Sequence, residues 1–372
     1  MNPTISIGRI FGIRVGFNWS WFLVFGLIVW SLAAGVFPSQ EPGHSHATYI
    51  AMGATASILF FTSLLLHEFG HAIRAKREGM VVEDVTLWLF GGVARFSGEF
   101  PNAAAEFRIA IAGPLVTLVI GSACLAATVI PGLPATVDGV ASWLGYINFL
   151  LLGFNLLPAL PLDGGRVLRS ALWQRRGDFA SATRTAASVS RMLAFGLVGG
   201  GFVVFLAGGG IGALWLAFIG WFLMQAAGSE LRFMLVHEAL AGLRVRDLMQ
   251  PNPVVVHPGR TIAEFMAEVA GAAWFASYPV VAGGEAIGVL PFRNVLAVPS
   301  TEWGVRLVRE CMIPATEMLV FAESDAAVDA FERLAANPLQ RGIVLEHDGA
   351  VGLLSITDIA RTLGRFSAGR AG

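Results

Sequence analysis

The chain has 372 residues, of which 55% are hydrophobic and 14% charged, with a net charge of −1 and a mean hydropathy of +0.67. Soluble globular proteins usually carry about 25% charged residues, so these values exclude a disordered chain, a nucleic-acid-binding protein and an ordinary soluble enzyme. Two widely separated cysteines, Cys124 and Cys311, predict no disulfide framework.

The composition changes near Leu243. Residues 1–244 contain 15 Lys and Arg against 12 Asp and Glu, and they hold nearly all of the long apolar runs. Residues 245–372 contain 10 basic and 14 acidic residues and are typical of soluble α/β sequence. We therefore expect a membrane domain over residues 1–244, followed by a soluble tail.

Six apolar runs in the first part approach the ~20 residues that cross a bilayer core. They leave too little polar surface for the alternative, a set of buried helices in a large soluble protein. Residues 1–17 contain no small-residue cleavage signature, so we interpret the first run as a retained helix rather than a signal peptide. The predicted spans are Trp19–Phe37, Ala47–Ile73, Ile109–Ile130, Val140–Leu157, Val189–Ala207 and Ile211–Ala227.

Basic residues are distributed asymmetrically around these spans. The connections 38–46, 131–139 and 208–210 contain no Lys or Arg, whereas the connections on the opposite side carry many. Cytoplasmic connections are enriched in Lys and Arg. The N-terminus, the C-terminus and the soluble tail are therefore predicted to be cytoplasmic.

The second span contains His67-Glu68-Phe69-Gly70-His71. Two histidines four residues apart lie on one face of a helix, so both imidazoles can reach one tetrahedral zinc ion, with the Glu beside a metal-activated water. Ionisable side chains are rare at membrane depth because each costs about 2.5–3.5 kcal/mol or more there. The pattern therefore favours a zinc site over the alternative, a hydrogen-bonded polar patch between helices.

A third protein ligand is expected, because catalytic zinc usually keeps three protein ligands and one open position. Asp163 is the best candidate, since it follows Pro158 and Pro161, which break the fourth span and leave irregular backbone at membrane depth. The next two residues, Gly164 and Gly165, allow a close approach of the chain. The alternative is that Asp163 is the N-cap of a helix that starts near Gly165.

Together these motifs resemble the site-2 protease family of intramembrane zinc metalloproteases, over the whole membrane part. The resemblance implies that His67, His71 and Asp163 hold zinc and that Glu68 is the general base and acid. It implies that Asn155 helps to position the substrate or to stabilise the oxyanion. The motifs that carry the resemblance are His67-Glu68-Phe69-Gly70-His71, Gly113-Pro114 and Asn155…Pro158…Pro161-Leu162-Asp163-Gly164-Gly165.

A segment between the second and third spans resembles the family's substrate-pairing strand. It covers residues 89–93 and includes Gly91 and Gly92. A substrate must be extended at the site because a helix buries its carbonyls in its own hydrogen bonds. Strand addition to residues 85–93 would supply that extension. The alternative for Val85–Phe96 is an ordinary interfacial hairpin.

Residues 166–176 predict an interfacial helix. Apolar side chains share one face of it, and basic side chains on the other face are expected to reach lipid phosphates. The basic residues are Arg166, Arg169, Arg175 and Arg176.

The tail contains two half-similar segments, which begin at Val245 and Val308, 63 residues apart. Each continues with a predicted helix, over residues 261–270 and 326–336, and then with two predicted strands. Internal repetition at this scale indicates two copies of one unit. The pattern resembles a pair of CBS domains, which we place at residues 245–300 and 308–366. Such pairs often bind adenosine nucleotides.

The two copies differ at the position where this resemblance implies a ribose contact. The second copy has Ser355-Ile-Thr357-Asp358, whereas the first has Pro291-Phe-Arg293-Asn294. We therefore expect one ATP or AMP site in the pair, at Thr357 and Asp358. The alternative is a purely structural module that joins two chains as a homodimer.

These observations predict an α-helical polytopic membrane protein with six transmembrane helices and a C-terminal cytoplasmic α/β CBS-domain pair. The resemblance implies a zinc endopeptidase of the cell membrane that cleaves transmembrane segments of other proteins in regulated intramembrane proteolysis. The alternative is a non-proteolytic transporter or sensor with a regulatory CBS tail. A transporter would carry charged residues in several spans, whereas here they cluster at one site.

Overall fold

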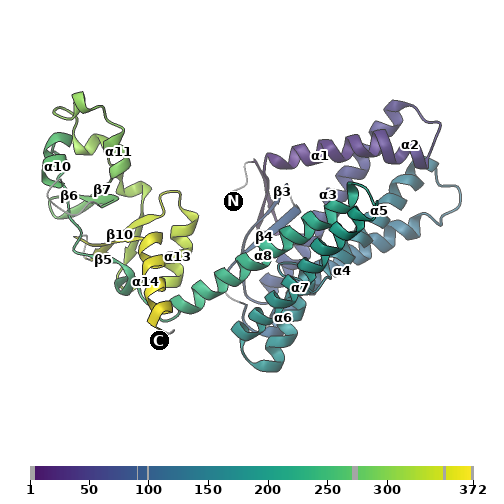
Figure 1. The fold of residues 1–372 in the computed structure, drawn as a ribbon. Coiled ribbons are helices and arrows are strands. Elements are labelled where there is room, and N and C mark those ends of the chain that lie inside the picture. The colour runs from purple at the N-terminus through teal and green to yellow at the C-terminus, as the bar shows by residue number, and fades with distance from the viewer. Residues whose placement is uncertain (1–4, 90, 99, 270–274, 347–348, 370–372) are drawn as a thin grey trace. The chain divides into compact units, whose positions relative to one another are not determined.

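The computed structural model describes residues 5–89, 91–98, 100–269, 275–346 and 349–369. The chain forms two compact units, Met1–Met234 and Leu235–Gly372, each of which has its own fold (Figure 1). The division falls within helix α8 (Gly212–Leu240), so the last turns of this helix belong to the C-terminal unit. That point lies ten residues before the change in composition.

Among the described residues, six helical segments are long and apolar enough to cross a membrane, as predicted. The first is interrupted by a π-helical stretch, Leu32–Val36, between α1 (Ser20–Ser31) and α2 (Phe37–Gln40). The others are α3 (His46–Arg77), α4 (Ala103–Ala127), α5 (Ala135–Asn155), α7 (Phe179–Leu206) and α8.

Two of these helices begin well before the apolar runs that predicted them. Helix α4 starts at Ala103 because the Asn102 side chain accepts a hydrogen bond from the Ala105 amide at 2.8 Å. Helix α7 starts after Asp178, whose carboxylate accepts from the Ala180 amide at 2.9 Å. Capping side chains set the ends of a helix, whereas hydropathy marks only the part that contacts lipid.

The N-terminal unit also contains a four-stranded sheet in the order β1 (Ile5–Ile10), β2 (Ile13–Phe17), β3 (Val81–Trp88) and β4 (Gly91–Ser97). Strand β2 pairs in parallel with β3, and β3 pairs antiparallel with β4. Strand β3 is therefore interior and has no free edge. The expected strand addition to residues 85–93 is wrong for residues 85–88, and β4 is the strand at the edge.

Helix α4 lies at the centre of the helical part, where it packs against α3, α5 and α6 (Asp163–Arg176). The α3–α4 contact is close: a Cβ on Gly70 would lie 2.8 Å from the Ala112 carbonyl oxygen. Close approach of backbones through small residues is typical of helix packing in membranes. Helix α6 is not among the six apolar segments.

The C-terminal unit repeats one pattern of helices and strands. The first copy is α9 (Val245–Leu248), β5 (Gln250–Pro251), α10 (Ile262–Val269), β6 (Ser277–Ala282), β7 (Glu285–Pro291) and α11 (Phe292–Leu296). The second is α12 (Val308–Cys311), β8 (Ile313–Pro314), β9 (Leu319–Ala322), α13 (Ala327–Ala336), β10 (Arg341–Glu346), β11 (Gly349–Ser355) and α14 (Ile356–Gly369). Both predicted helices are present as α10 and α13, although Ala270, the last residue expected in the first, lies outside the described residues.

The two copies exchange their short strands. Strand β5 of the first copy pairs with β11 of the second, and β8 of the second pairs with β7 of the first. Each copy also encloses its own cluster of buried apolar side chains, one around Phe321 and Leu354 and the other around Phe265 and Tyr278. The strand exchange joins the two copies into one α/β body.

Candidate metal centre

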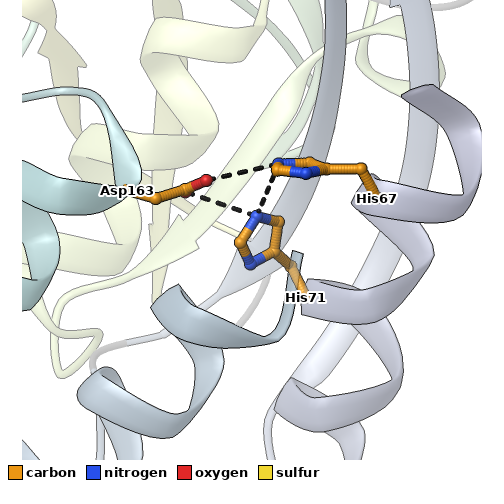
Figure 2. A group of neighbouring side chains, drawn as sticks. All are labelled: His67, His71 and Asp163. Carbon is orange, nitrogen blue, oxygen red and sulfur yellow. Dashed lines mark hydrogen bonds and ion pairs between the residues drawn. The ribbon is translucent and has the colours of Figure 1, made fainter. Parts of the chain in front are cut away.

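Three potential ligand side chains converge in the helical part of the N-terminal unit. His67 and His71 lie one turn apart on α3, and Asp163 is the first residue of α6. The two Nε2 atoms are 3.1 Å apart. His67 Nε2 lies 3.2 Å and His71 Nε2 3.3 Å from the carboxylate oxygens of Asp163. Figure 2 shows the imidazoles and the carboxylate pointing toward one another.

The outer ring nitrogens of both histidines are held by α4. His71 Nδ1 lies 2.7 Å from the Ile109 carbonyl oxygen, and His67 Nδ1 lies 2.8 Å from the Thr117 hydroxyl. A carbonyl only accepts hydrogen bonds, so His71 Nδ1 carries the proton and a neutral His71 presents the Nε2 lone pair to the site. Such outer hydrogen bonds orient metal-binding histidines.

Gly113 completes the wall of the site on the same helix. It lies between Ile109 and Thr117 at intervals of four residues, so the three face α3 together. A Cβ on Gly113 would overlap His71 Nε2 and would lie 2.8 Å from His67 Nε2. Only glycine fits there, which gives a physical reason for the Gly113-Pro114 motif in the third span.

The irregular segment before α6 brings Asp163 to the histidines. Helix α5 ends at Asn155, and α6 begins at Asp163 itself, with Leu162 as its N-cap residue. The alternative assignment of Asp163 as N-cap of a helix starting near Gly165 is therefore wrong. A Cβ on Gly164 would overlap the Leu156 carbonyl, so the segment folds tightly against the start of α6.

The three side chains fit a zinc ion. Ligand atoms about 2.0–2.1 Å from one zinc at tetrahedral angles lie roughly 3.3 Å apart. The shortest approaches between the three side chains are 3.1, 3.2 and 3.3 Å, with Oδ2 of Asp163 nearest to His67 and Oδ1 nearest to His71. Both histidines are buried, and Asp163 Oδ2 is a buried oxygen without a hydrogen-bond partner among the described residues. Two imidazole nitrogens and one carboxylate are a donor set that zinc prefers.

Glu68 projects from α3 toward the edge strand of the sheet. A Cβ on Gly92 of β4 would overlap Glu68 Cγ and would lie 2.9 Å from Glu68 Cδ and Oε1. The half-buried carboxylate therefore packs directly on the backbone of β4. Gly91, the first residue of β4, has a φ of 126°, a conformation that favours glycine. Phe90, in the same predicted segment, lies outside the described residues.

Asn155 is the last residue of α5 and is half-buried. No hydrogen bond or ion pair of the described residues joins Asn155 to His67, His71 or Asp163. The segment Leu156–Leu162 separates it from α6. The site as described thus consists of the His–Asp group with Glu68 and Gly92 beside it.

In the C-terminal unit, Thr357 and Asp358 line a cavity of about 320 Å³. The Asp358 carboxylate already accepts hydrogen bonds from the Ser355 amide at 3.1 Å and from the Ser355 hydroxyl at 2.6 Å. The Asp358 amide donates to the Ser355 hydroxyl in return, at 3.3 Å. Asp358 thus forms a reciprocal cap at the start of α14.

Arg341 lines both this cavity and a second one of about 460 Å³. Burial lowers the pKa of Arg341, and Asp358 opposes that change by its negative charge. The second cavity is lined by Arg293, the counterpart of Thr357, and no acidic residue of the described chain lines it. The acidic residue that distinguishes the two copies in sequence therefore also distinguishes their cavities.

One expectation for residues 166–176 is wrong. Arg169 cannot reach lipid phosphates, because it is 2% exposed and its guanidinium binds Glu106 of α4 and Glu230 of α8. Sequence reasoning did not identify Glu106, Glu230 or Thr117 as partners. A signal for Glu106 was available, since it is an acidic residue at the start of an apolar run.

Comparison with known proteins gives two family matches. The model of peptidase family M50 matches residues 55–134 and 133–199, and the CBS domain model matches residues 245–300. Rip3 of Mycobacterium tuberculosis, whose name assigns it as a zinc metalloprotease, is 36% identical over 98% of this chain and 93% of its own length. Zinc metalloprotease MJ0392 of Methanocaldococcus jannaschii is 30% identical over 98% of this chain and 97% of its own.

Among solved structures, the site-2 protease from Methanocaldococcus jannaschii matches with 29% identity and a TM-score of 0.41. That match covers 61% of this chain and 94% of the solved chain.

Proposed function

The chain belongs to peptidase family M50, the site-2 proteases, and is a multi-pass membrane zinc metalloprotease with a CBS region; from this premise we propose a role for each residue of its site. His67, His71 and Asp163 hold the zinc ion, and Glu68 is the general base and acid. The observation that carries this proposal is the convergence of three ligand side chains, whose nearest atoms are 3.1–3.3 Å apart, with both outer histidine nitrogens held by α4.

Bound zinc supplies an activated water and polarises the carbonyl to be attacked. Glu68 would accept a proton from the attacking water and would return it to the nitrogen of the leaving amine. The carboxylate is held against Gly92 and is half-buried, so it stays close to the His–Asp group. A half-buried carboxylate is also shielded from bulk solvent, which strengthens its electrostatic effect on the reacting atoms.

The substrate is a membrane protein, and we propose that it is bound as an extended segment along β4. This strand is at the sheet edge, and its residue Gly92 touches Glu68. An added strand would place a peptide bond beside the base. Gly91 and Gly92 then position the substrate backbone, and Asn155 orients the substrate or stabilises the oxyanion. The expected substrate is a transmembrane segment already trimmed by another protease, as the family resemblance implies.

The proposal also covers the orientation of the protein in the membrane and the function of its C-terminal tail. Residues 1–244 form the protease domain, with the N-terminus, the C-terminus and the tail in the cytoplasm, because the connections 38–46, 131–139 and 208–210 lack Lys and Arg. Residues 245–300 and 308–366 form a CBS pair, supported by the exchange of β5 and β8. The pair binds ATP or AMP near Thr357 and Asp358 and modulates cleavage, or it joins two chains as a dimer.

The test distinguishes the role of Glu68 as base from the role of a metal ligand. Because Glu68 does not hold zinc in this scheme, Glu68→Gln should keep one zinc ion per chain. It should slow cleavage of a single-span membrane protein in vesicles by about 10²–10⁴-fold. Zinc content by elemental analysis and product by mass spectrometry are measured on the full chain. Glu41→Gln, in the connection between α2 and α3, is the matched control and should behave as wild type. Normal turnover by Glu68→Gln would exclude the proposed base.

A further inference from the structure

A buried charge cluster joins three helices of the N-terminal unit. Arg169 of α6 donates from Nε to Glu106 of α4 at 2.7 Å and from Nη1 to Glu230 of α8 at 3.0 Å. Arg169 is 2% exposed and Glu106 is 0% exposed.

The position of Glu106 on α4 relates this cluster to the metal centre. Glu106 lies three residues before Ile109, whose carbonyl holds His71, and the Gly113 and Thr117 contacts follow on the same helix. Helix α4 therefore carries the residues that hold the two histidines and also Glu106, which binds Arg169 of α6. The histidines and Asp163 come from different helices, and α4 packs against both of these helices.

Helix α6 needs such a contact with α4. Its first residue is Asp163, and the seven residues from Leu156 to Leu162 that precede it are not helical. Gly164 and Gly165 pack closely on this segment, and the Arg169 cluster adds a contact from the middle of α6 to α4. The carboxylate must be held closely for metal binding, since small displacements of a ligand weaken the site.

We propose that Arg169 is a positioning residue that holds Asp163 against His67 and His71 by fixing α6 on α4 through Glu106, with Glu230 completing the clamp. Among the described residues, no hydrogen bond or ion pair joins Arg169 to His67, His71 or Asp163. This inference rests on the proposed function, because it requires that Asp163 is a zinc ligand. The guanidinium is suited to the task, because its fixed fork of donors binds two carboxylates in one geometry.

The test is a double-mutant cycle on metal retention in the full-length protein in lipid nanodiscs. The rate at which zinc passes to a chelator is measured for wild type, Arg169→Gln, Asp163→Ala and the double variant. Arg169→Gln should lose zinc at least about tenfold faster, as is usual when a partner outside the ligand set is removed. In the Asp163→Ala background the same change should add nothing, because no carboxylate remains to be positioned.

Arg176→Gln is the matched control. It is the same substitution on the same helix, but Arg176 is exposed, and its hydrogen-bond partners among the described residues are the hydroxyls of Ser181 and Thr185. It should lose zinc at the wild-type rate. Arg169→Lys and Glu106→Gln extend the cycle with milder changes, and they decide the question if Arg169→Gln does not fold. Each should accelerate zinc loss, by less than Arg169→Gln.

The outcomes are distinguishable. If Asp163→Ala retains zinc as wild type does, the ligand assignment of the proposed function fails. If Asp163→Ala loses zinc but the Arg169 and Glu106 variants retain it, the positioning role is overturned. Effects of Arg169→Gln and Asp163→Ala that simply add would also overturn it, because they would indicate a general loss of packing.

Discussion

Two regions of this molecule place polar groups around a carboxylate, Asp163 in one and Asp358 in the other. The regions differ in whether the oxygens of that carboxylate have hydrogen-bond partners within the protein. At the metal centre, Asp163 Oδ2 has no hydrogen-bond partner among the described residues, and the outer nitrogens of both histidines bind α4. In the C-terminal cavity, Asp358 accepts two hydrogen bonds from Ser355.

This difference distinguishes the metal centre, where a carboxylate oxygen is available to a ligand, from the Asp358 region, where the carboxylate stabilises the fold. Buried polar atoms are nearly always paired, so unpaired atoms that converge indicate a missing partner. Asp163 Oδ2 meets this criterion at the metal centre, and the Nε2 atoms of both histidines converge on the same carboxylate. Asp358 does not, since its carboxylate already stabilises the start of α14 and would have to share its oxygens with a ribose.

The largest effect is expected from filling the space at the metal centre. In Gly113→Ala, the new Cβ would overlap His71 Nε2 and crowd His67 Nε2. Neither imidazole could then present its lone pair to a metal. We expect loss of zinc from the purified protein and complete loss of cleavage, measured by elemental analysis and by proteolysis of a membrane substrate.

The control is Gly153→Ala on α5, where a new Cβ would meet no atom within 4 Å. This variant should keep both zinc and activity, apart from the small gain in helix propensity that alanine brings. Full zinc occupancy in Gly113→Ala would show that the histidines do not converge at this wall, and the contrast with Asp358 would disappear.

A smaller effect is expected beside the metal, at the contact of the sheet with Glu68. In Gly92→Ala, the Cβ would overlap Glu68 Cγ and displace the carboxylate from β4. Zinc should remain, because the ligand set is untouched. The kcat should fall by about 10²-fold or more, since a displaced base cannot transfer the proton well. The measurement is kcat together with zinc content, and loss of the metal would show that Gly92 supports the ligands instead.

The contrast also explains how much could be predicted from the sequence. The pair His67 and His71 is a local pattern, since four residues on a helix fix their relative position. Asp163 was identified from the two prolines and two glycines around it. The α/β character of the tail and the six spans follow from periodicity and hydropathy in the same way.

What could not be predicted depends on contacts between distant segments. Thr117 lies 50 residues from His67, and threonine is common in apolar helices, so nothing in its surroundings marks it as a partner. Arg169 lies among other arginines and resembles a surface residue until α4 and α8 enclose it. The hairpin of β1 and β2 is short, and it is stabilised by parallel pairing with β3, more than 60 residues later.

The smallest effect, and the most discriminating for the tail, is expected from Asp358→Ala. If the carboxylate binds the ribose hydroxyls of ATP or AMP, its loss should weaken nucleotide binding at least about tenfold, because charge-assisted hydrogen bonds contribute roughly 1.5–3 kcal/mol each. Calorimetry on the full chain measures the affinity. Asp325→Ala is the matched control, since Asp325 also accepts from a nearby backbone amide, that of Ala322, but does not line the cavity. Equal affinity in wild type and Asp358→Ala would assign the carboxylate to the cap of α14 alone. The absence of heat from either nucleotide would favour the dimerisation module.

A tenfold loss confined to Asp358→Ala would have a consequence for the comparison of the two regions. It would mean that a carboxylate already hydrogen-bonded within its own helix can still bind a ligand, so the two regions would differ only in degree.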